Sequence, residues 1–554
     1  MLSLLETFQQ APAPVGGNLA LSALIGLIPL AVVFVALGVL RLKAHVAALI
    51  GLGTAAMIAI FAFQMPANLT LLAATQGAAY GLFPIQWIVI TAILIYQLAV
   101  VSGKFEYVRG TFDAVSDDPR VQAVLIAFCF GGLLEALAGF GAPVAITATM
   151  IIALGVSPVR AACAVLMANT APVAFGSLAI PITTAAGLTG LSAHDIGAIT
   201  GRQAPLLALI VPTLLLFLID GKRGVKEVWP VALVTGATFG LAQFLVSNYV
   251  STELTDIVAA LAGLFVTVGF LRLWQPKGGE QARDRFADET ERTTGARPVR
   301  APRQQLTAGN VFLGLFPYLL VIAVFSIVNL IPAVKKAVTS TDILFGWPGL
   351  AGNVLDATGK AVGATTYKLN LLSNPGSLLL LCCLIVMLVY RVSPKTFAAE
   401  FRGVIYKLRW SILTVASVLS LAYVLNLSGQ TITIGTWVAS AGAAFAFLSP
   451  LLGWFGTAVT GSDTSANALF SKLQQTAGQQ TGIDPNLLIA ANTTGGVLGK
   501  MVSPQNLSIA AASVKMDGQE SVLFRKMLPW SLGLLVFLCT LVYLQSTVLS
   551  NMLP

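Results

Sequence analysis

The sequence GGLLEALAGFGAPVAI, residues 131–146, indicates the fold because it is apolar on both sides of a break. It lies within the apolar segment 121–154, which is longer than the roughly 20 residues that one membrane-crossing helix needs. Glycine and proline interrupt that segment at its centre, in GFGAP at 139–143. Non-helical backbone is tolerated at membrane depth only where protein or a water-filled cavity surrounds it. We therefore predict that 121–154 is a re-entrant hairpin, which enters the membrane and returns to the same side.

A second apolar segment, 431–472, is interrupted in the same way by GWFGTAVTGSDTS at 453–465, and we predict a second re-entrant hairpin there. The rest of the chain contains further apolar runs that are long enough to cross a membrane. We predict about twelve such crossings, at 19–40, 44–63, 84–102, 158–180, 205–219, 229–249, 252–272, 309–331, 377–390, 410–427, 485–503 and 529–549.

The composition also indicates a membrane protein. Of the 554 residues, 56% are hydrophobic and only 10% are charged, whereas an average soluble protein is roughly 45–50% apolar and about 25% charged. The predicted fold class is all-α, a polytopic helical membrane protein, which excludes a soluble enzyme and a disordered chain. The five cysteines lie in apolar runs without metal-binding spacing, so we predict no metal or other cofactor. The basic residues form no soluble nucleic-acid-binding module, and the lipid bilayer is the expected environment.

The positive charges predict the orientation of the chain, because Lys and Arg concentrate in cytoplasmic loops. Most of the 32 Lys and Arg fall on one face if the N-terminus, which contains neither residue before Arg41, lies outside. This layout places both termini on the outer side of a bacterial cytoplasmic membrane. It holds only if both interrupted segments are hairpins, of which the first opens to the cytoplasm and the second to the outside.

The two hairpins belong to an internal repeat. Residues 167–182, MANTAPVAFGSLAIPI, align with 490–505, AANTTGGVLGKMVSPQ, and the two share Asn-Thr followed by a Gly and a Pro at equal spacing. The alternative is a chance likeness between small-residue helices. The loop charges give the copies opposite orientations, and inverted repeats with interrupted helices are typical of secondary transporters. We predict a first repeat at 1–274, a flexible cytoplasmic polar linker at 275–306 and a second repeat at 307–554.

The chain resembles the bacterial L-lactate permease family over almost its whole length. The motifs that carry the resemblance are GGLLEALAGFGAPVAI at 131–146, ANTAPVAFGS at 168–177, TGSDTSANALF at 460–470 and ANTTGGVLGKMVSPQNL at 491–507. The resemblance implies uptake of lactate, and often of glycolate, together with protons across the cytoplasmic membrane. It also implies an ion-transporter-superfamily-like fold, in which hairpin tips and broken helices form the substrate site. Composition and spacing by themselves indicate only a site for a small polar anion.

A small monocarboxylate needs hydrogen-bond donors and positive potential, and helix N-termini supply both. The hairpin tips would present such helix ends to the substrate. The alternative is that their glycines only allow close packing of helices. The candidate substrate-binding residues are Gly139, Phe140, Gly141 and Ala142 in the first tip, and Ser462, Thr464 and Ser465 in the second.

The repeated Asn-Thr pairs are further candidates for substrate binding. They are Asn169 with Thr170, and Asn492 with Thr493. Their amides and hydroxyls can bind the carboxylate and hydroxyl of lactate, or satisfy an unwound backbone. The alternative is an ordinary hydrogen bond between helices, which Asn and Thr often make in membranes.

Three charged residues stand in apolar sequence, where an ionisable group is costly and is a functional candidate by default. We predict Glu135 and Asp463 as proton-coupling residues, with a structural protonated Glu135 and a helix cap at Asp463 as the alternatives. Lys500 is a candidate partner for the substrate carboxylate, for Asp463 or for Glu135. Alternatively, its long side chain reaches the inner interface.

The predicted function is secondary active transport, and not an enzymatic reaction. A small monocarboxylate (L-lactate, D-lactate or glycolate) would enter with protons by alternating access. A sodium-coupled carboxylate or dicarboxylate carrier of the same fold is the main alternative. A channel would need a filter sequence or a charge ring, and a membrane enzyme would need a nucleophile–base pair or a metal cluster, for which two His residues offer little.

Overall fold

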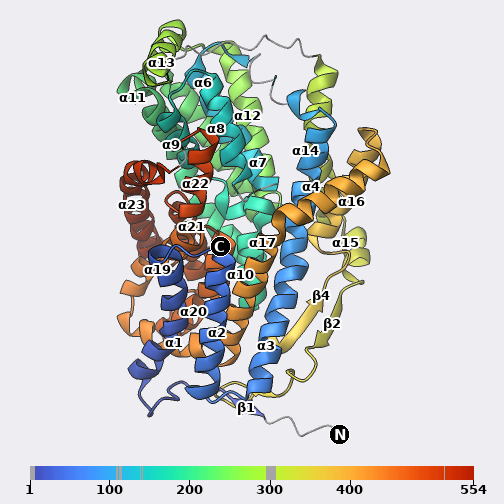
Figure 1. Ribbon diagram of the computed structural model, residues 1–554, viewed down its shortest axis with the longest axis vertical. Coiled ribbons are helices and arrows are strands. Elements are labelled where there is room, and N and C mark those ends of the chain that lie inside the picture. Colours follow the sequence, from blue (N-terminus) through green and yellow to red (C-terminus); the bar gives the residue numbers. More distant parts are fainter. Residues whose placement is uncertain are drawn as a thin grey trace.

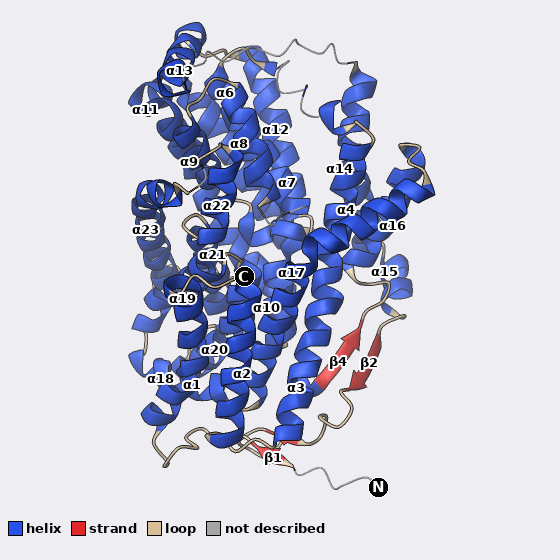
Figure 2. Cartoon of the chain, viewed as in Figure 1, coloured by secondary structure: helices blue, strands red, loops and turns tan. Residues whose placement is uncertain are grey.

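The computed structural model describes residues 7–107, 110, 115–137, 139, 141–294, 307–516 and 518–554. These residues form an elongated bundle of helices with two very small sheets (Figures 1 and 2). Within the described ranges, ten helices are long and apolar enough to cross a membrane, or eleven if one bent pair counts as a span. The predicted class of polytopic helical membrane protein is thus confirmed, although the prediction of twelve spans differs at several places.

The segment of the first predicted hairpin folds as two helical arms. The first arm joins α6 (Pro119–Ala123), η3 (Val124–Phe130) and α7 (Gly131–Leu137), and the second is α8 (Ala142–Ala153). Helix α8 packs against both η3 and α7, so the arms lie side by side. Every residue of the first arm is buried in protein, as a broken membrane segment requires. The first arm is also long enough to cross a membrane by itself, and its re-entrant course stays a prediction.

The second helix–tip–helix unit lies further along the chain than the predicted segment 431–472. Its arms are α19 (Ala444–Thr460) and α20 (Asp463–Thr481), which pack together and meet at Gly461 and Ser462. The predicted segment begins instead with α18 (Gln430–Val438) and η6 (Ala439–Ala441). Apolarity misplaced the bounds because α20 ends in the polar sequence QQTAGQQT at 474–481, of which 474–478 are buried although they are mostly polar.

The predicted span 158–180 is not one straight helix. Helix α9 (Pro158–Ala168) ends before the short η4 (Val173–Phe175) and α10 (Gly176–Thr189), and the two parts are bent by 59°. Pro172 falls in the break, where its ring and missing N–H oppose a continuous helix. In the second copy Gly495 stands at the aligned position, and α21 (Pro485–Lys500) continues through it. A turn then leads into α22 (Pro504–Ser513).

The remaining helices surround these interrupted segments. The predicted spans 205–219 and 229–249 are parts of one 57-residue element, which changes direction at Gly221 (φ 63°, ψ −151°). The surrounding helices are α1 (Leu19–Phe34) with η1 (Val35–Val39), α2 (Ala44–Phe61), α3 (Ala67–Tyr80) with η2 (Gly81–Gln86), α4 (Trp87–Val101), α11 (Ala193–Tyr249), α12 (Thr255–Leu273), α14 (Ala308–Leu330), α16 (Pro375–Val389), α17 (Pro394–Leu427) and α23 (Glu520–Gln545).

The segment 332–376 folds beside the N-terminal residues at one end of the bundle (Figure 1). It begins with α15 (Pro332–Thr339). Strand β2 (Ile343–Gly346) pairs antiparallel with β4 (Thr366–Leu369), and β3 (Val354–Leu355) pairs parallel with β1 (Phe8–Gln9). The short η5 (Gly363–Thr365) lies in this segment, and η7 (Ser550–Met552) ends the chain.

The polar segment 275–306 is not a flexible linker throughout. Residues Gly279–Thr294 form helix α13 at the opposite end of the bundle from the strands (Figure 1). Ion pairs attach α13 to neighbouring helices: Arg285 binds Asp220 on α11, and Glu289 binds Arg160 on α9. The charges that suggested a solvated linker therefore hold this helix in place. Residues 295–306 lie outside the described part of the chain.

Candidate functional site

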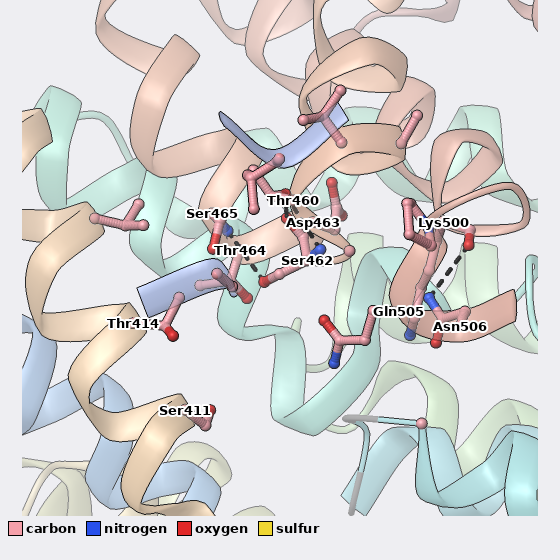
Figure 3. A pocket seen from close by; sticks show the side chains of 18 of the residues that line it. Ser411, Thr414, Thr460, Ser462, Asp463, Thr464, Ser465, Lys500, Gln505 and Asn506 are labelled. Carbon is pink, nitrogen blue, oxygen red and sulfur yellow. Dashed lines mark hydrogen bonds between the residues drawn. The ribbon is translucent and has the colours of Figure 1, made fainter. Parts of the chain in front are cut away.

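A cavity of about 1290 Å³ lies where the interrupted segments meet. The tip between α19 and α20, the start of α22 and the charged groups of Glu135 and Lys500 line one side. Helices α1, α2 and α17 line the other side, with Phe455 of α19 facing the same space. Figure 3 shows the polar side chains of the α20 tip, α22 and α17 around this opening. The cavity thus combines both charges and hydroxyl groups with an apolar wall.

Glu135 and Lys500 form a buried ion pair at this cavity. The Lys500 Nζ lies 2.6 Å from Glu135 Oε1, and the two side chains are 10% and 4% exposed. The second carboxylate oxygen of Glu135 accepts a hydrogen bond of 2.9 Å from Asn169 Nδ2. The sequence offered the substrate carboxylate, Asp463 or Glu135 as partners of Lys500, and the structure pairs it with Glu135. The Lys500 side chain therefore does not extend to the membrane interface. The pair joins α7 to the end of α21.

Asp463 occupies the first turn of α20, beside the same cavity. Its Oδ1 lies 3.4 Å from both Thr457 Oγ1 and Asn467 Nδ2. Its Oδ2 has no hydrogen-bond partner among the described residues, although the side chain is only 4% exposed. The N-terminal end of the helix dipole favours a negative charge at this position. Asp463 does not bind Lys500, so the two predicted proton-coupling residues have different surroundings.

The hydroxyl groups of the α20 tip form a compact cap. Ser462 is the N-cap of the helix, and its Oγ accepts a hydrogen bond of 3.2 Å from the Ser465 N–H. The Ser462 N–H donates in turn to Thr460 Oγ1 at 3.3 Å. Thr464 lies in the same turn and lines the cavity, as do Ser462 and Ser465 (Figure 3). The three residues predicted in this tip are therefore at the cavity.

The first hairpin tip approaches the cavity through its glycines. Gly141, the N-cap of α8, has φ +82° and lines the cavity. Gly139 has φ +50°, and a Cβ at this position would lie 2.4 Å from Ser177 Oγ, so the residue permits close packing against α10. Ala142 begins α8. Phe140, which was predicted with them, lies outside the described residues.

The predicted Asn-Thr pairs are not part of the cavity lining that the described residues form. Asn467 Oδ1 accepts hydrogen bonds from Asn492 Nδ2 at 3.2 Å and from Thr493 Oγ1 at 2.9 Å, which links α21 to α20. Thr170 donates to the Met167 carbonyl at 2.6 Å. Asn492 and Thr493 thus make hydrogen bonds between helices, which was the alternative to substrate binding. Asn169 acts through Glu135, whose carboxylate it holds.

Sequence reasoning missed Gln505 and Ser177, which both line the cavity. Gln505 follows Pro504 in the first turn of α22, and its amide group lies beside the α20 tip in Figure 3. The signal for it was available, since Pro at the first helical position marks a helix start. Ser177 belongs to three consecutive residues with positive φ, which no composition rule predicts.

The three residues Ser177, Leu178 and Ala179 have φ values of 46°, 59° and 57°. Residues other than glycine adopt this left-handed region at a cost of order 1–3 kcal/mol each, and such strain clusters at functional sites. The same turn brings Gly176 against Glu135, because a Cβ on Gly176 would lie 2.9 Å from Glu135 Oε1. The strained turn therefore places the backbone of Gly176 against the Glu135 carboxylate of the ion pair.

Several helix N-termini converge on this cavity. Helices α8, α20 and α22 have the N-caps Gly141, Ser462 and Ser503, and residues of each cap or first turn line the cavity. The free N–H groups and positive dipole ends of helices favour an anion. A chain of membrane-crossing helices with broken segments and helix ends around a charged cavity defines a membrane transport protein.

Comparisons with known proteins specify this class further. Residues 22–549 match the model of the family described as L-lactate permease. The chain is 41% identical to the L-lactate permease of Bacillus subtilis (strain 168), over 98% of this chain and 99% of that protein. It is 42% identical to the glycolate permease GlcA of Escherichia coli (strain K12), over 99% of both chains. The chain belongs to the L-lactate permease family.

Among solved structures, the YdaH transporter of Alcanivorax borkumensis aligns with 77% of this chain and 89% of its own. The sequence identity is 13% and the TM-score is 0.32. This similarity is too low to indicate where a substrate would bind.

Proposed function

We propose that this protein imports lactate, and also glycolate, across the bacterial cytoplasmic membrane by proton symport. The match to the L-lactate permease family and the relatives named for lactate and glycolate support this substrate class. The observation that carries the proton coupling is the buried pair of Lys500 and Glu135 at the cavity. When the proton acceptor of such a pair is protonated, the cation can bind a substrate anion. The proton and the anion then occupy the site together.

The proposed exchange conserves the charge of the site. With the cavity empty, Lys500 and Glu135 neutralise each other. When Glu135 takes up a proton, Lys500 loses its partner, and an uncompensated buried cation is strongly unfavourable. The lactate carboxylate then replaces Glu135 as the partner of Lys500. The loaded and empty sites both have zero net charge, so proton and anion enter together because neither is stable there alone.

The α20 tip and α22 provide the remaining contacts of the proposed site. A 2-hydroxy acid presents one hydroxyl besides its carboxylate. The hydroxyls of Ser462 and Thr464 and the amide of Gln505 line the same cavity. The helix N-termini there add positive potential without adding a formal charge. Asp463 would serve as a second proton acceptor in the tip, or would hold the α20 N-terminus.

We further propose that the two halves, 1–274 and 307–554, are inverted repeats that support alternating access, with both chain termini outside. The opposite orientation of the loop charges and the shared Asn-Thr, Gly and Pro pattern support this arrangement.

Uptake of radiolabelled L-lactate into proteoliposomes tests the function. We expect accumulation when the interior is alkaline, with competition by D-lactate and glycolate. A sodium gradient at equal pH should not drive uptake. Accumulation that follows sodium and ignores the pH gradient would instead establish the sodium-coupled carrier.

The variant Glu135→Gln tests the role of the ion pair. Glutamine imitates the protonated acid, so Lys500 stays free to bind lactate, but no proton can be released. We expect loss of gradient-driven accumulation with retained lactate exchange. The exposed Glu291→Gln on α13 is the matched control and should accumulate lactate normally. Normal accumulation by Glu135→Gln would remove Glu135 from the coupling.

A further inference from the structure

A second buried carboxyl lies outside the cavity, between α11 and α12. Asp256 and Gln243 are both 0% exposed. Gln243 Nε2 donates to Asp256 Oδ1 at 2.8 Å and approaches the carbonyl of Ala171 at 3.2 Å. Two oxygens of this pair, Asp256 Oδ2 and Gln243 Oε1, have no hydrogen-bond partner among the described residues. Buried polar atoms are rarely left in this state.

A single proton accounts for both unpartnered oxygens. A carboxylate oxygen and an amide oxygen can only accept hydrogen bonds, so neither satisfies the other. If Asp256 is protonated at Oδ2, its O–H can donate to Gln243 Oε1 while Gln243 Nε2 continues to donate to Oδ1. The acid and the amide then form a closed pair of two hydrogen bonds. A buried carboxylate without a cation would be far less stable.

Among the described residues, no Lys, Arg or His forms an ion pair with Asp256. On α7 the ionisable residue is Glu135, which is paired with Lys500. On α11, Arg202 is bound to Asn248 Oδ1 and to the Met552 carbonyl. Glu253, just before α12, accepts from Ser251. In η3 the titratable residue is Cys129, and α10 contains no ionisable side chain.

The acid–amide pair is connected to the candidate substrate site through the broken helix. Ala171, whose carbonyl Gln243 contacts, lies in the break between α9 and η4. Asn169, in the same break, holds the Glu135 carboxylate. The proton on Asp256 thus fixes the amide orientation of Gln243, and Gln243 holds the backbone that positions Asn169. Loss of that proton would leave Asp256 Oδ2 and Gln243 Oε1 as two acceptors that cannot bond to each other, which opposes this amide orientation and with it the contact to the Ala171 carbonyl.

We propose that Asp256 is a further proton-binding site, separate from Glu135 and Asp463, in which the proton is shared with Gln243 and its presence holds the break at 169–175 in the shape seen here. Its part in transport rests on the proposed function, whereas proton binding itself does not. Its link to the candidate substrate site runs through Gln243, the Ala171 carbonyl and Asn169, which holds Glu135.

Infrared spectroscopy of the purified protein at neutral pH tests proton binding without any transport. We expect the carbonyl-stretch band of a protonated carboxyl, of which one component disappears in Asp256→Asn. Asparagine can make both hydrogen bonds of the pair, so this variant should fold. In Gln243→Met the same component should shift towards the position of an unbonded acid. The control Glu253→Gln should leave it unchanged.

The following results would overturn the proposal or its part in transport. An unchanged band in Asp256→Asn would overturn proton binding at this residue. In the wild type, the band component assigned to Asp256 could disappear when sodium chloride replaces choline chloride. This result would show a sodium ion between Asp256 Oδ2 and Gln243 Oε1, and it would also overturn the proposal. The transport role is tested by the pH profile of lactate exchange, which should lose one titration step in Asp256→Asn. An unchanged profile would overturn the coupling, while a wild type that does not transport lactate would refute the proposed function alone.

Discussion

At the scale of single residues, the Lys500–Glu135 pair makes each partner depend on the other. Lys500 and Glu135, whose side chains are 10% and 4% exposed, would each be unfavourable as an unpaired buried charge. Their mutual attraction offsets the cost of removing them from water only while both are present. Removing one partner of a buried pair costs about 3–5 kcal/mol, whereas replacing both by apolar residues is often nearly neutral. The pair therefore adds little net stability, and its proposed role is proton coupling.

This asymmetry predicts the thermal stability of three variants in detergent. Lys500→Met and Glu135→Leu should each lower the melting temperature, because each leaves one buried charge uncompensated. The double variant should be more stable than either single one. The exposed Lys335→Met provides the control for loss of a surface lysine. A double variant whose loss equals the sum of the single losses would contradict a direct pair.

At the scale of elements, the contact between α19 and α21 depends on glycine. Added Cβ atoms at Gly453, Gly495 and Gly499 would lie 1.8–2.1 Å from backbone oxygens of the facing helix. Backbone atoms cannot yield as side chains do. Small residues at helix interfaces let membrane helices approach closely, and here they also position the second hairpin.

Alanine substitution separates packing glycines from free ones. We expect Gly453→Ala to lower the yield and the melting temperature sharply, because its Cβ would lie 1.8 Å from the Asn492 carbonyl oxygen. Gly533→Ala on α23 meets nothing within 4 Å and should be neutral, or stabilising by up to about 1 kcal/mol through helix propensity. Size-exclusion profiles and melting curves measure both. Equal stability of the two variants would refute the close contact.

Helix α13 is attached by ion pairs of very different burial. Arg120 is fully buried and binds Asp118 at 2.8 Å and Asp220 at 3.3 Å, and Asp220 also binds Arg285 of α13. The pair of Arg160 and Glu289 is 42% and 36% exposed.

These exposures predict unequal effects of removing each arginine. Arg120→Met should cost about 3–5 kcal/mol, because it leaves buried carboxylates unpaired. Arg160→Met should cost at most about 1 kcal/mol, as for other solvent-exposed pairs. Melting temperatures at low and high salt test this, and only the Arg160 contribution should fall with added salt. A larger loss from Arg160→Met would reverse the assignment.

Much of this element structure could be predicted from the sequence, and the failures have local causes. Hairpin-like segments and most helices follow from apolar length and from Gly and Pro. The bend at 169–175 falls inside one predicted span, 158–180; the Asn-Thr pair suggested an unwound backbone there, but apolarity does not report the effect of Pro172 or the angle of the bend. Cavity residues such as Gln505 and Ser177 depend on which helix ends meet, and that is a tertiary property. The pairing of Lys500 with Glu135 joins residues 365 positions apart, so sequence could name both and not select the pair.

At the scale of the whole molecule, ionisable residues at the start of α2, in the turn before it and in α23 join the ion pair in lining the cavity. Arg41, Lys43, His45 and Glu520 line it together with the ion pair. The loop charges predict that these segments lie on the cytoplasmic face. We therefore predict that the cavity opens to the cytoplasm.

Cysteine labelling tests the assignment in intact cells and inverted vesicles. The five native cysteines are free and buried, so they contribute little background. Lys43→Cys should react with a membrane-impermeant maleimide only in inverted vesicles, and the exposed Lys360→Cys only in intact cells. Lactate should slow the labelling of Lys43→Cys alone. Labelling of Lys43→Cys from outside would reverse the topology.

The size of the cavity has a pharmacological consequence. Pockets that enclose drug-sized ligands measure about 300–1,000 Å³, and this one, at about 1290 Å³, is larger still. A three-carbon acid fills only a small part of it, next to Lys500 and the α20 tip. The unfilled part borders aromatic side chains, including Trp410 and Phe455. A 2-hydroxy acid with an aryl extension should therefore bind as a competitive inhibitor that is too bulky to be carried across.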